Sequence, residues 1–68
     1  MKATRKQALM LDALIEHGHN KLIGRALHIE ERSVSMMLLR LKQIHNANSN
    51  VKLAIMWERF KREQQANS

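Results

Sequence analysis

Hydrophobic positions recur along most of the chain with the spacing of amphipathic helices. Between residues 20 and 42, apolar residues return every three or four positions, first over a short run and then over a longer one. The runs are separated by His28, Ile29 and Glu30, and Ile29 is expected to fill the space between two helices. The inward positions of the longer run are expected to be Val34, Met37, Leu38, Leu41 and either Ile44 or His45. The pattern therefore predicts two helices joined by a tight turn, a helix-turn-helix.

The segment before this unit predicts a further helix. Thr4 and Gln7 have the spacing of a capping box, and an apolar stripe follows over residues 8–15. Gly18 stands where a left-handed glycine ends a helix, and Asn20 is expected to cap the next one. Gly24 lies inside that short helix, where Gly costs about 1 kcal/mol relative to Ala. Its presence indicates that another helix approaches closely there.

A last helix is predicted over residues 51–62, after a polar loop in which Ser49 or Asn50 should cap it. Its apolar residues are too many for one stripe, and a helix that is apolar over most of its girth is buried on more than one side. One side is expected to pack on the core and the other on a second copy of the chain. The residues predicted at this dimer interface are Val51, Leu53, Met56, Trp57 and Phe60. The tail, residues 63–68, is polar and is expected to fray.

These elements predict one all-α domain over residues 1–68, because 68 residues permit a single domain. The expected architecture is a four-helix helix-turn-helix domain, with a tri-helical core and a C-terminal dimerisation helix. The chain has no Pro to interrupt these helices, and no Cys to cross-link them. Its recognition helix is predicted over about residues 31–45.

The charge of the chain favours a polyanionic partner. Twelve Lys and Arg stand against six Asp and Glu, which gives a formal net charge of +6. On the outward face of the predicted recognition helix, Arg can donate two hydrogen bonds to guanine, Gln can hydrogen-bond to adenine, and Ser can hydrogen-bond to either base. The candidates for phosphate contacts are Lys21, Arg25, Ser33, Lys42 and Lys52. An N-terminal arm of Lys2, Arg5 and Lys6 is a candidate for a backbone or minor-groove contact. The residues expected to contact double-stranded DNA are Lys21, Arg25, Arg32, Ser33, Ser35, Met36, Arg40, Lys42 and Gln43.

Residues 20–37 also carry a family resemblance. The run reads N-K-x-I-G-x-x-L-x-I-E-x-x-S-V-x-x-M and resembles the helix-turn-helix of LuxR-type (GerE-like) regulators, N-K-E-I-A-x-x-L-x-I-S-x-x-T-V-x-x-H. Gly24 stands where that family has a small Ala, and Glu30 where it has a Ser that caps the recognition helix. The likeness extends over roughly residues 4–57. It implies a four-helix DNA-binding domain whose last helix mediates dimerisation.

A second interpretation rests on Met36 and Leu39, which are apolar on the outward face of the reading helix. They suit contacts with thymine methyl groups, but they also suit a protein-binding patch, since Met adapts its shape to a partner. The alternative function is therefore an adaptor that modulates a larger regulator or RNA polymerase, and RNA binding is a third possibility.

The sequence offers no chemistry for catalysis. It has no Cys nucleophile, no G-x-S-x-G motif and no phosphate-binding loop, so an enzyme is not expected. His17 and His19 form an H-x-H pair without a third ligand at a suitable spacing, so neither a metal nor another cofactor is expected. No apolar run has the roughly 20 residues needed to span a bilayer, and none resembles a signal peptide. A cytoplasmic location is the expectation.

Overall fold

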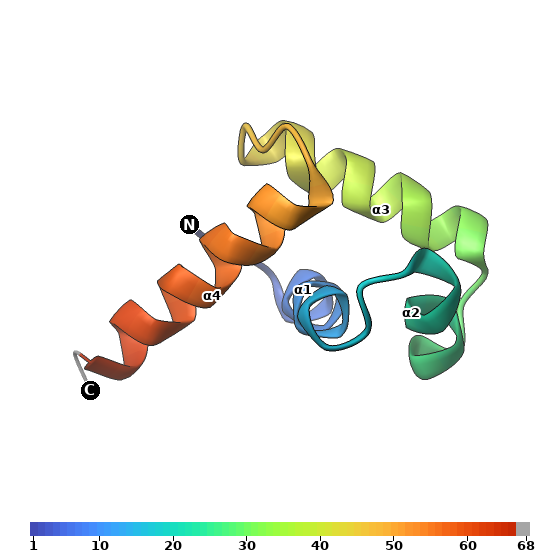
Figure 1. Ribbon diagram of the computed structural model, residues 1–68, viewed down its shortest axis with the longest axis horizontal. Coiled ribbons are helices and arrows are strands. Elements are labelled where there is room, and N and C mark those ends of the chain that lie inside the picture. Colours follow the sequence, from blue (N-terminus) through green and yellow to red (C-terminus); the bar gives the residue numbers. More distant parts are fainter. Residues whose placement is uncertain (67–68) are drawn as a thin grey trace.

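The computed structural model describes residues 1–66, which form four α-helices and, over that range, no strand. The helices are α1 (Arg5–His17), α2 (Asn20–Leu27), α3 (Glu31–Ile44) and α4 (Asn50–Ala66). In Figure 1, α1 runs through the middle of the molecule, with α3 above it and α2 and α4 on opposite sides. Within residues 1–66, α2 and α4 do not touch each other, and both pack against α1 and α3. The predicted all-α, four-helix fold is confirmed.

The helix ends follow the capping residues of the sequence, with one exception. The Gln7 N–H donates to Thr4 Oγ1 at 3.2 Å and the Thr4 N–H donates to Gln7 Oε1 at 2.9 Å, so the capping box is formed. Gly18 ends α1 in the left-handed conformation with φ of 76°. Asn20, predicted as the cap of α2, is instead its first helical residue. His19 holds the cap position and makes no side-chain bond there.

The turn between α2 and α3 explains Gly24. The Ile29 N–H donates to the Gly24 carbonyl oxygen at 2.9 Å, and His28 reverses the chain with φ of 59°. A Cβ on Gly24 would lie 2.7 Å from the carbonyl oxygen of Ile29, which is backbone. The predicted close approach to Gly24 is therefore found, but its nearest part is the turn after the same helix, and the next helix contributes only its first residue, with the Glu31 nitrogen 3.5 Å from the Cβ position.

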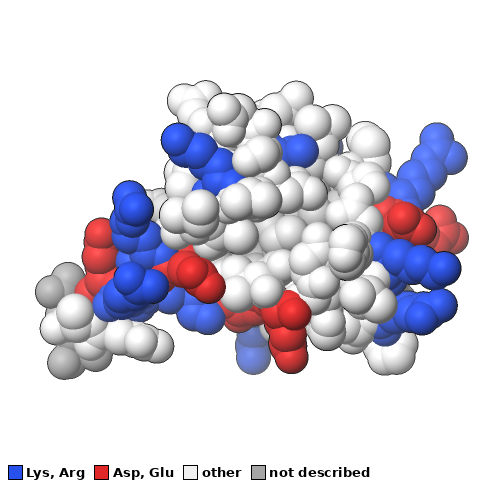
Figure 2. Space-filling view, viewed as in Figure 1, with Lys and Arg blue, Asp and Glu red and all other residues white. Residues whose placement is uncertain are grey.

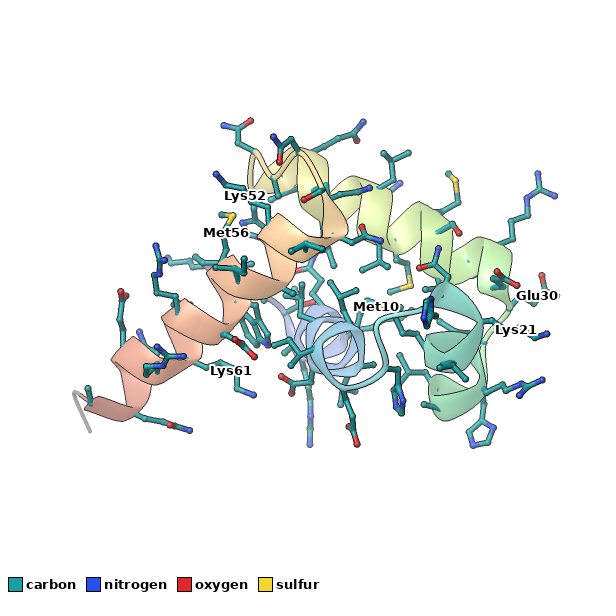
Figure 3. All side chains as sticks on the ribbon, viewed as in Figure 1. Met10, Lys21, Glu30, Lys52, Met56 and Lys61 are labelled. Atoms are coloured by element: carbon teal, nitrogen blue, oxygen red, sulfur yellow. The ribbon has the colours of Figure 1, made fainter. Side chains whose placement is uncertain are left out.

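The core lies between α1 and the three other helices. Met10 occupies the space enclosed by α1, α2 and α3, and only 1% of its surface is exposed (Figure 3). The predicted inward positions of α3 are buried at Val34, Leu38 and Leu41 and half-buried at Met37. Of the two residues predicted to end this stripe, His45 is half-buried, whereas Ile44 is 56% exposed and does not face the core. The complete set of buried apolar residues is Met10, Leu11, Ala13, Leu14, Ile23, Val34, Leu38, Leu41, Ala47, Leu53 and Trp57.

Helix α4 is fixed to α1 by a polar contact at the edge of this core. Trp57 Nε1–H and the Lys61 ammonium both donate to Asp12 Oδ1, each at 2.8 Å. Partial burial of Asp12 would raise its carboxyl pKa, but the hydrogen bonds from Lys61 and Trp57 and the charge of Lys61 outweigh it. The pKa therefore lies below its ordinary value of 3.8. Trp57 also stacks on Phe60, with 5.5 Å between ring centroids.

Helix α4 is longer than the sequence pattern predicted. It continues to Ala66, so residues 63–66 are helical rather than a frayed tail, and residues 67–68 lie outside the described part. The added turn has no buried residue and consists of polar residues and Ala. Glu, Gln and Ala are good helix formers. High helix propensity therefore favours continuation of the helix past the end of its apolar pattern.

Candidate nucleic-acid interface

The outward face of α3 has no buried residue. Because Val34, Leu38 and Leu41 turn inward, the residues about half a turn away from them point to solvent. The candidate base-reading residues are all exposed: Arg32, Ser35, Met36, Arg40 and Gln43. Ser33, a candidate phosphate contact, is exposed as well. In the residues described, no ion pair engages Arg32 or Arg40, so both guanidinium groups keep their donors free. The face thus presents cationic, amide, hydroxyl and thioether groups along one side of a rigid helix.

Ser35 is held in place by a neighbour that the sequence pattern did not connect to it. The Asn20 side-chain amide donates to Ser35 Oγ at 2.8 Å and joins the first residue of α2 to α3. The hydroxyl of Ser35 still has its own proton to donate. Asn20 was predicted as a helix cap, and the structure instead makes it a positioning residue for the α3 surface.

The cations predicted to contact phosphate flank this face on more than one side. Lys21 and Arg25 are exposed on α2, and Lys42 is half-buried on α3. Figure 2 shows Lys and Arg gathered at the end formed by α2 and the start of α3, and again over α4, with a largely uncharged surface between them. Figure 3 shows Lys21 and Glu30 at the same end. Glu30 and its neighbour Glu31 lower the positive charge at that end.

The predicted N-terminal arm is shorter than expected. Arg5 and Lys6 belong to the first turn of α1, and Met1 and Ala3 pack against the core, so only Lys2 projects from an extended segment. Lys6 consequently has a fixed position on α1. It lies at the edge of a surface groove that the sequence did not reveal.

This groove runs between α1 and the first half of α3 and has a volume of about 690 Å³. Its floor is apolar, and its exposed side chains include Leu9 and Met36, which are 55% and 60% exposed. The residues that line it are Lys6, Leu9, Met10, Leu27, Ile29, Arg32, Ser33, Met36, Met37 and Arg40. Leu39 lines a different hollow with the loop after α3. Met36 and Leu39 are both exposed, as the sequence predicts, and they lie beside different hollows.

The predicted dimer residues divide between two sides of α4. Leu53 is 0% exposed and Trp57 is 6% exposed, because both are part of this chain's own core, so their assignment to an intersubunit surface is wrong. Met56 and Phe60 are half-buried and also pack on the core. Val51 is 70% exposed, and so remains available to a partner. Its neighbour one turn later, Ile55, is 50% exposed and was not among the predicted interface residues.

Other kinds of site find little support in the described part. No group of three or more His, Asp or Glu side chains lies close enough to hold a metal ion. None of the helices described is long and apolar enough to cross a bilayer.

Comparisons with protein families, with curated proteins and with solved structures returned no match.

Proposed function

We propose that this chain is a small DNA-binding transcriptional regulator and that α3 reads base edges in the major groove. The observation that carries the proposal is the outward face of α3, which is exposed and carries Arg32, Arg40 and Gln43 on a helix that packs on α1 and α2. A helix of this kind, preceded by a shorter helix and a tight turn, is the usual reading element of helix-turn-helix proteins. The resemblance of residues 20–37 to LuxR-type regulators supports the same function, and a cytoplasmic location fits it.

The proposed roles follow from the chemistry of each side chain. Arg32 and Arg40 offer paired N–H donors to guanine, and Gln43 suits the edge of adenine. Lys21 and Arg25 on α2, together with Lys42 on α3, would neutralise DNA phosphates on either side of the major groove. Glu30 and Glu31 lie at the start of α3 and repel DNA phosphates. DNA binding therefore depends on how the start of α3 is oriented toward the DNA backbone.

We further propose that two copies associate through the outer side of α4. Val51 and Ile55 lie one turn apart and form an exposed apolar pair beside a hollow between α1 and α4. A two-fold contact of this kind would bring two α3 helices to half-sites about one helical turn of DNA apart. The homodimer would then read a roughly palindromic operator.

The first test is repeated selection of random duplex DNA by the purified chain, with affinity measured across salt concentrations. The proposal expects an enriched palindromic motif and a steep loss of affinity with salt, because phosphate contacts release counterions. Arg40→Ala should lower the affinity for the selected DNA site by roughly 5- to 150-fold, which corresponds to about 1–3 kcal/mol for the loss of a bidentate contact to a base. Gln64→Ala, on the distant last turn of α4, is the matched control. The absence of any enriched motif would refute sequence reading by α3.

The dimer is tested separately by analytical ultracentrifugation. The double variant Val51→Lys, Ile55→Lys should sediment as a monomer at concentrations where the unmodified chain is a dimer, with an unchanged circular dichroism spectrum. Both side chains are exposed, so the substitutions leave the core intact. If the unmodified chain is already a monomer at high concentration, the homodimer proposal is refuted. DNA reading by a single copy is then judged by the DNA selection alone.

A further inference from the structure

We propose that the groove between α1 and α3 is a second binding site, and that it takes an acidic amphipathic helix from a partner protein. The argument starts from the shape and lining of the groove. Leu9 on one wall and Met36 on the other are large apolar side chains, more than half exposed, above a floor that includes the buried Met10. Apolar side chains on two facing helices leave a trough that an apolar helix face can fill.

The charges around the groove select the partner. Lys6 stands at the α1 edge and Arg32 and Arg40 at the α3 edge. In the residues that the structure describes, none of the three forms an ion pair. An apolar segment flanked by Asp or Glu would place its carboxylates against these three cations. The rim therefore favours an acidic partner.

The dimensions suit a helix better than a small molecule. Arg32 and Arg40 are eight positions apart on α3, which corresponds to about 12 Å, or roughly two helical turns. A partner helix with apolar residues at i, i+3 or i+4 and i+7 presents its anchors over the same length. A small ligand is normally enclosed over most of its surface, whereas Leu9 and Met36 leave this groove open.

The chain's own exposed apolar helix face does not fit this groove. That face is on α4, beside Val51 and Ile55. Helix α4 carries Lys52, Arg59, Lys61 and Arg62 against Glu58 and Glu63, so its net charge is positive. A basic helix would be repelled by the basic rim, so the expected occupant is a different protein.

Occupation of the groove has a consequence that rests on the proposed function. Arg32, Met36 and Arg40 belong both to the groove and to the outward face of α3. A helix seated in the groove would cover groups that DNA needs. The partner and DNA would therefore exclude each other, and an acidic partner would release the regulator from its operator.

The test uses a displayed library of acidic amphipathic helices of about 15 residues, long enough to hold helical structure. The library is selected on the full chain without DNA. Peptides are then measured by fluorescence polarisation against Leu9→Ala, which removes an apolar wall of the groove without changing its charge, and Leu22→Ala, which truncates an exposed Leu of α2 outside it. We expect enriched peptides with acidic residues beside a helical apolar stripe. Their affinity should fall about tenfold or more in Leu9→Ala and stay unchanged in Leu22→Ala.

Two outcomes would overturn the proposal: no enrichment above an unselected library, or enriched peptides that bind Leu9→Ala as tightly as the unmodified chain. Competition is measured afterwards. The selected peptide should displace DNA from the unmodified chain at concentrations that leave Leu9→Ala bound to DNA. If the chain binds peptide but no DNA, the groove proposal stands and the proposed DNA function fails. If it binds DNA but no peptide, the reverse holds.

Discussion

Substitution of Gly24 by Ala sets two physical effects of opposite sign against each other. Ala favours a helix interior by about 1 kcal/mol relative to Gly, and the LuxR-type pattern has Ala at the corresponding position. Against this, the new Cβ would lie 2.7 Å from the Ile29 carbonyl oxygen. That oxygen is backbone, and it belongs to the turn whose N–H is already bonded to the Gly24 carbonyl at 2.9 Å. The turn cannot move away without lengthening this hydrogen bond or shifting the start of α3.

The magnitude follows from these two effects. Overpacking that displaces backbone costs about 1–3 kcal/mol, and the helix preference of Ala returns about 1 kcal/mol. The net expectation is a loss of about 1 kcal/mol in the free energy of unfolding for Gly24→Ala. For a domain of this size, that loss lowers the melting temperature by about 4–8 °C.

The assay is thermal and urea unfolding followed by far-UV circular dichroism. Ala26→Gly is the matched control, because Ala26 is exposed in the same helix and reports helix preference without a clash. Ala26→Gly should destabilise by about the 1 kcal/mol of the propensity difference. A higher melting temperature for Gly24→Ala would refute the reasoning, since it would mean that helix preference dominates and that the turn yields freely.

Three further substitutions test other contacts. Trp57→Ala should lower the free energy of unfolding by about 3–5 kcal/mol, as expected for a buried aromatic, and equilibrium urea unfolding should detect it; a loss below 1 kcal/mol would contradict its place in the core. Asp12→Asn keeps an acceptor for Trp57 but loses the charge, so its cost should be within about 1 kcal/mol for a carboxylate that is 47% exposed. The pKa of Asp12 in the folded chain lies below its ordinary value of 3.8. The Asp12 charge therefore stabilises the fold fully at pH values above the pKa of the unfolded chain, and this stabilisation is lost as the pH falls through the pKa of the folded chain. A difference in stability between the unmodified chain and Asp12→Asn that persists below that pH would contradict the reasoning. His28→Gly should raise stability by about 0.5–1 kcal/mol, because φ of 59° strains an L-residue and the relief exceeds the entropy that Gly adds to the unfolded chain; a lower melting temperature would count against it.

Local signals in the sequence predicted much of this fold. The capping box of Thr4 and Gln7 and the glycine at position 18 act within a few residues, and the inward stripe of α3 depends only on helical period. Each could be read from the residues alone. The exposed face of α3 followed directly, because it is the complement of that stripe.

Features that depend on two distant segments were not predictable in the same way. The hydrogen bond from Trp57 to Asp12 and the groove between Leu9 and Met36 arise only when α1 meets α4 or α3. Leu53 and Trp57 were assigned to a partner because α4 is apolar over most of its girth. The packing of α4 against both α1 and α3 covers more of that girth than a single neighbour would.

The hydrogen bond between Trp57 and Asp12 has a consequence for the rate of folding. It joins residues 45 positions apart, whereas α2 contacts only the helices next to it in the chain. Closing a long loop costs more entropy than closing a short one, and contacts between chain neighbours form faster. This topology predicts that α4 docks late, and contacts that form late affect the rate of unfolding more than the rate of folding. We therefore expect substitutions in α4 to change chiefly how fast the molecule unfolds, and substitutions in the first three helices to change how fast it folds.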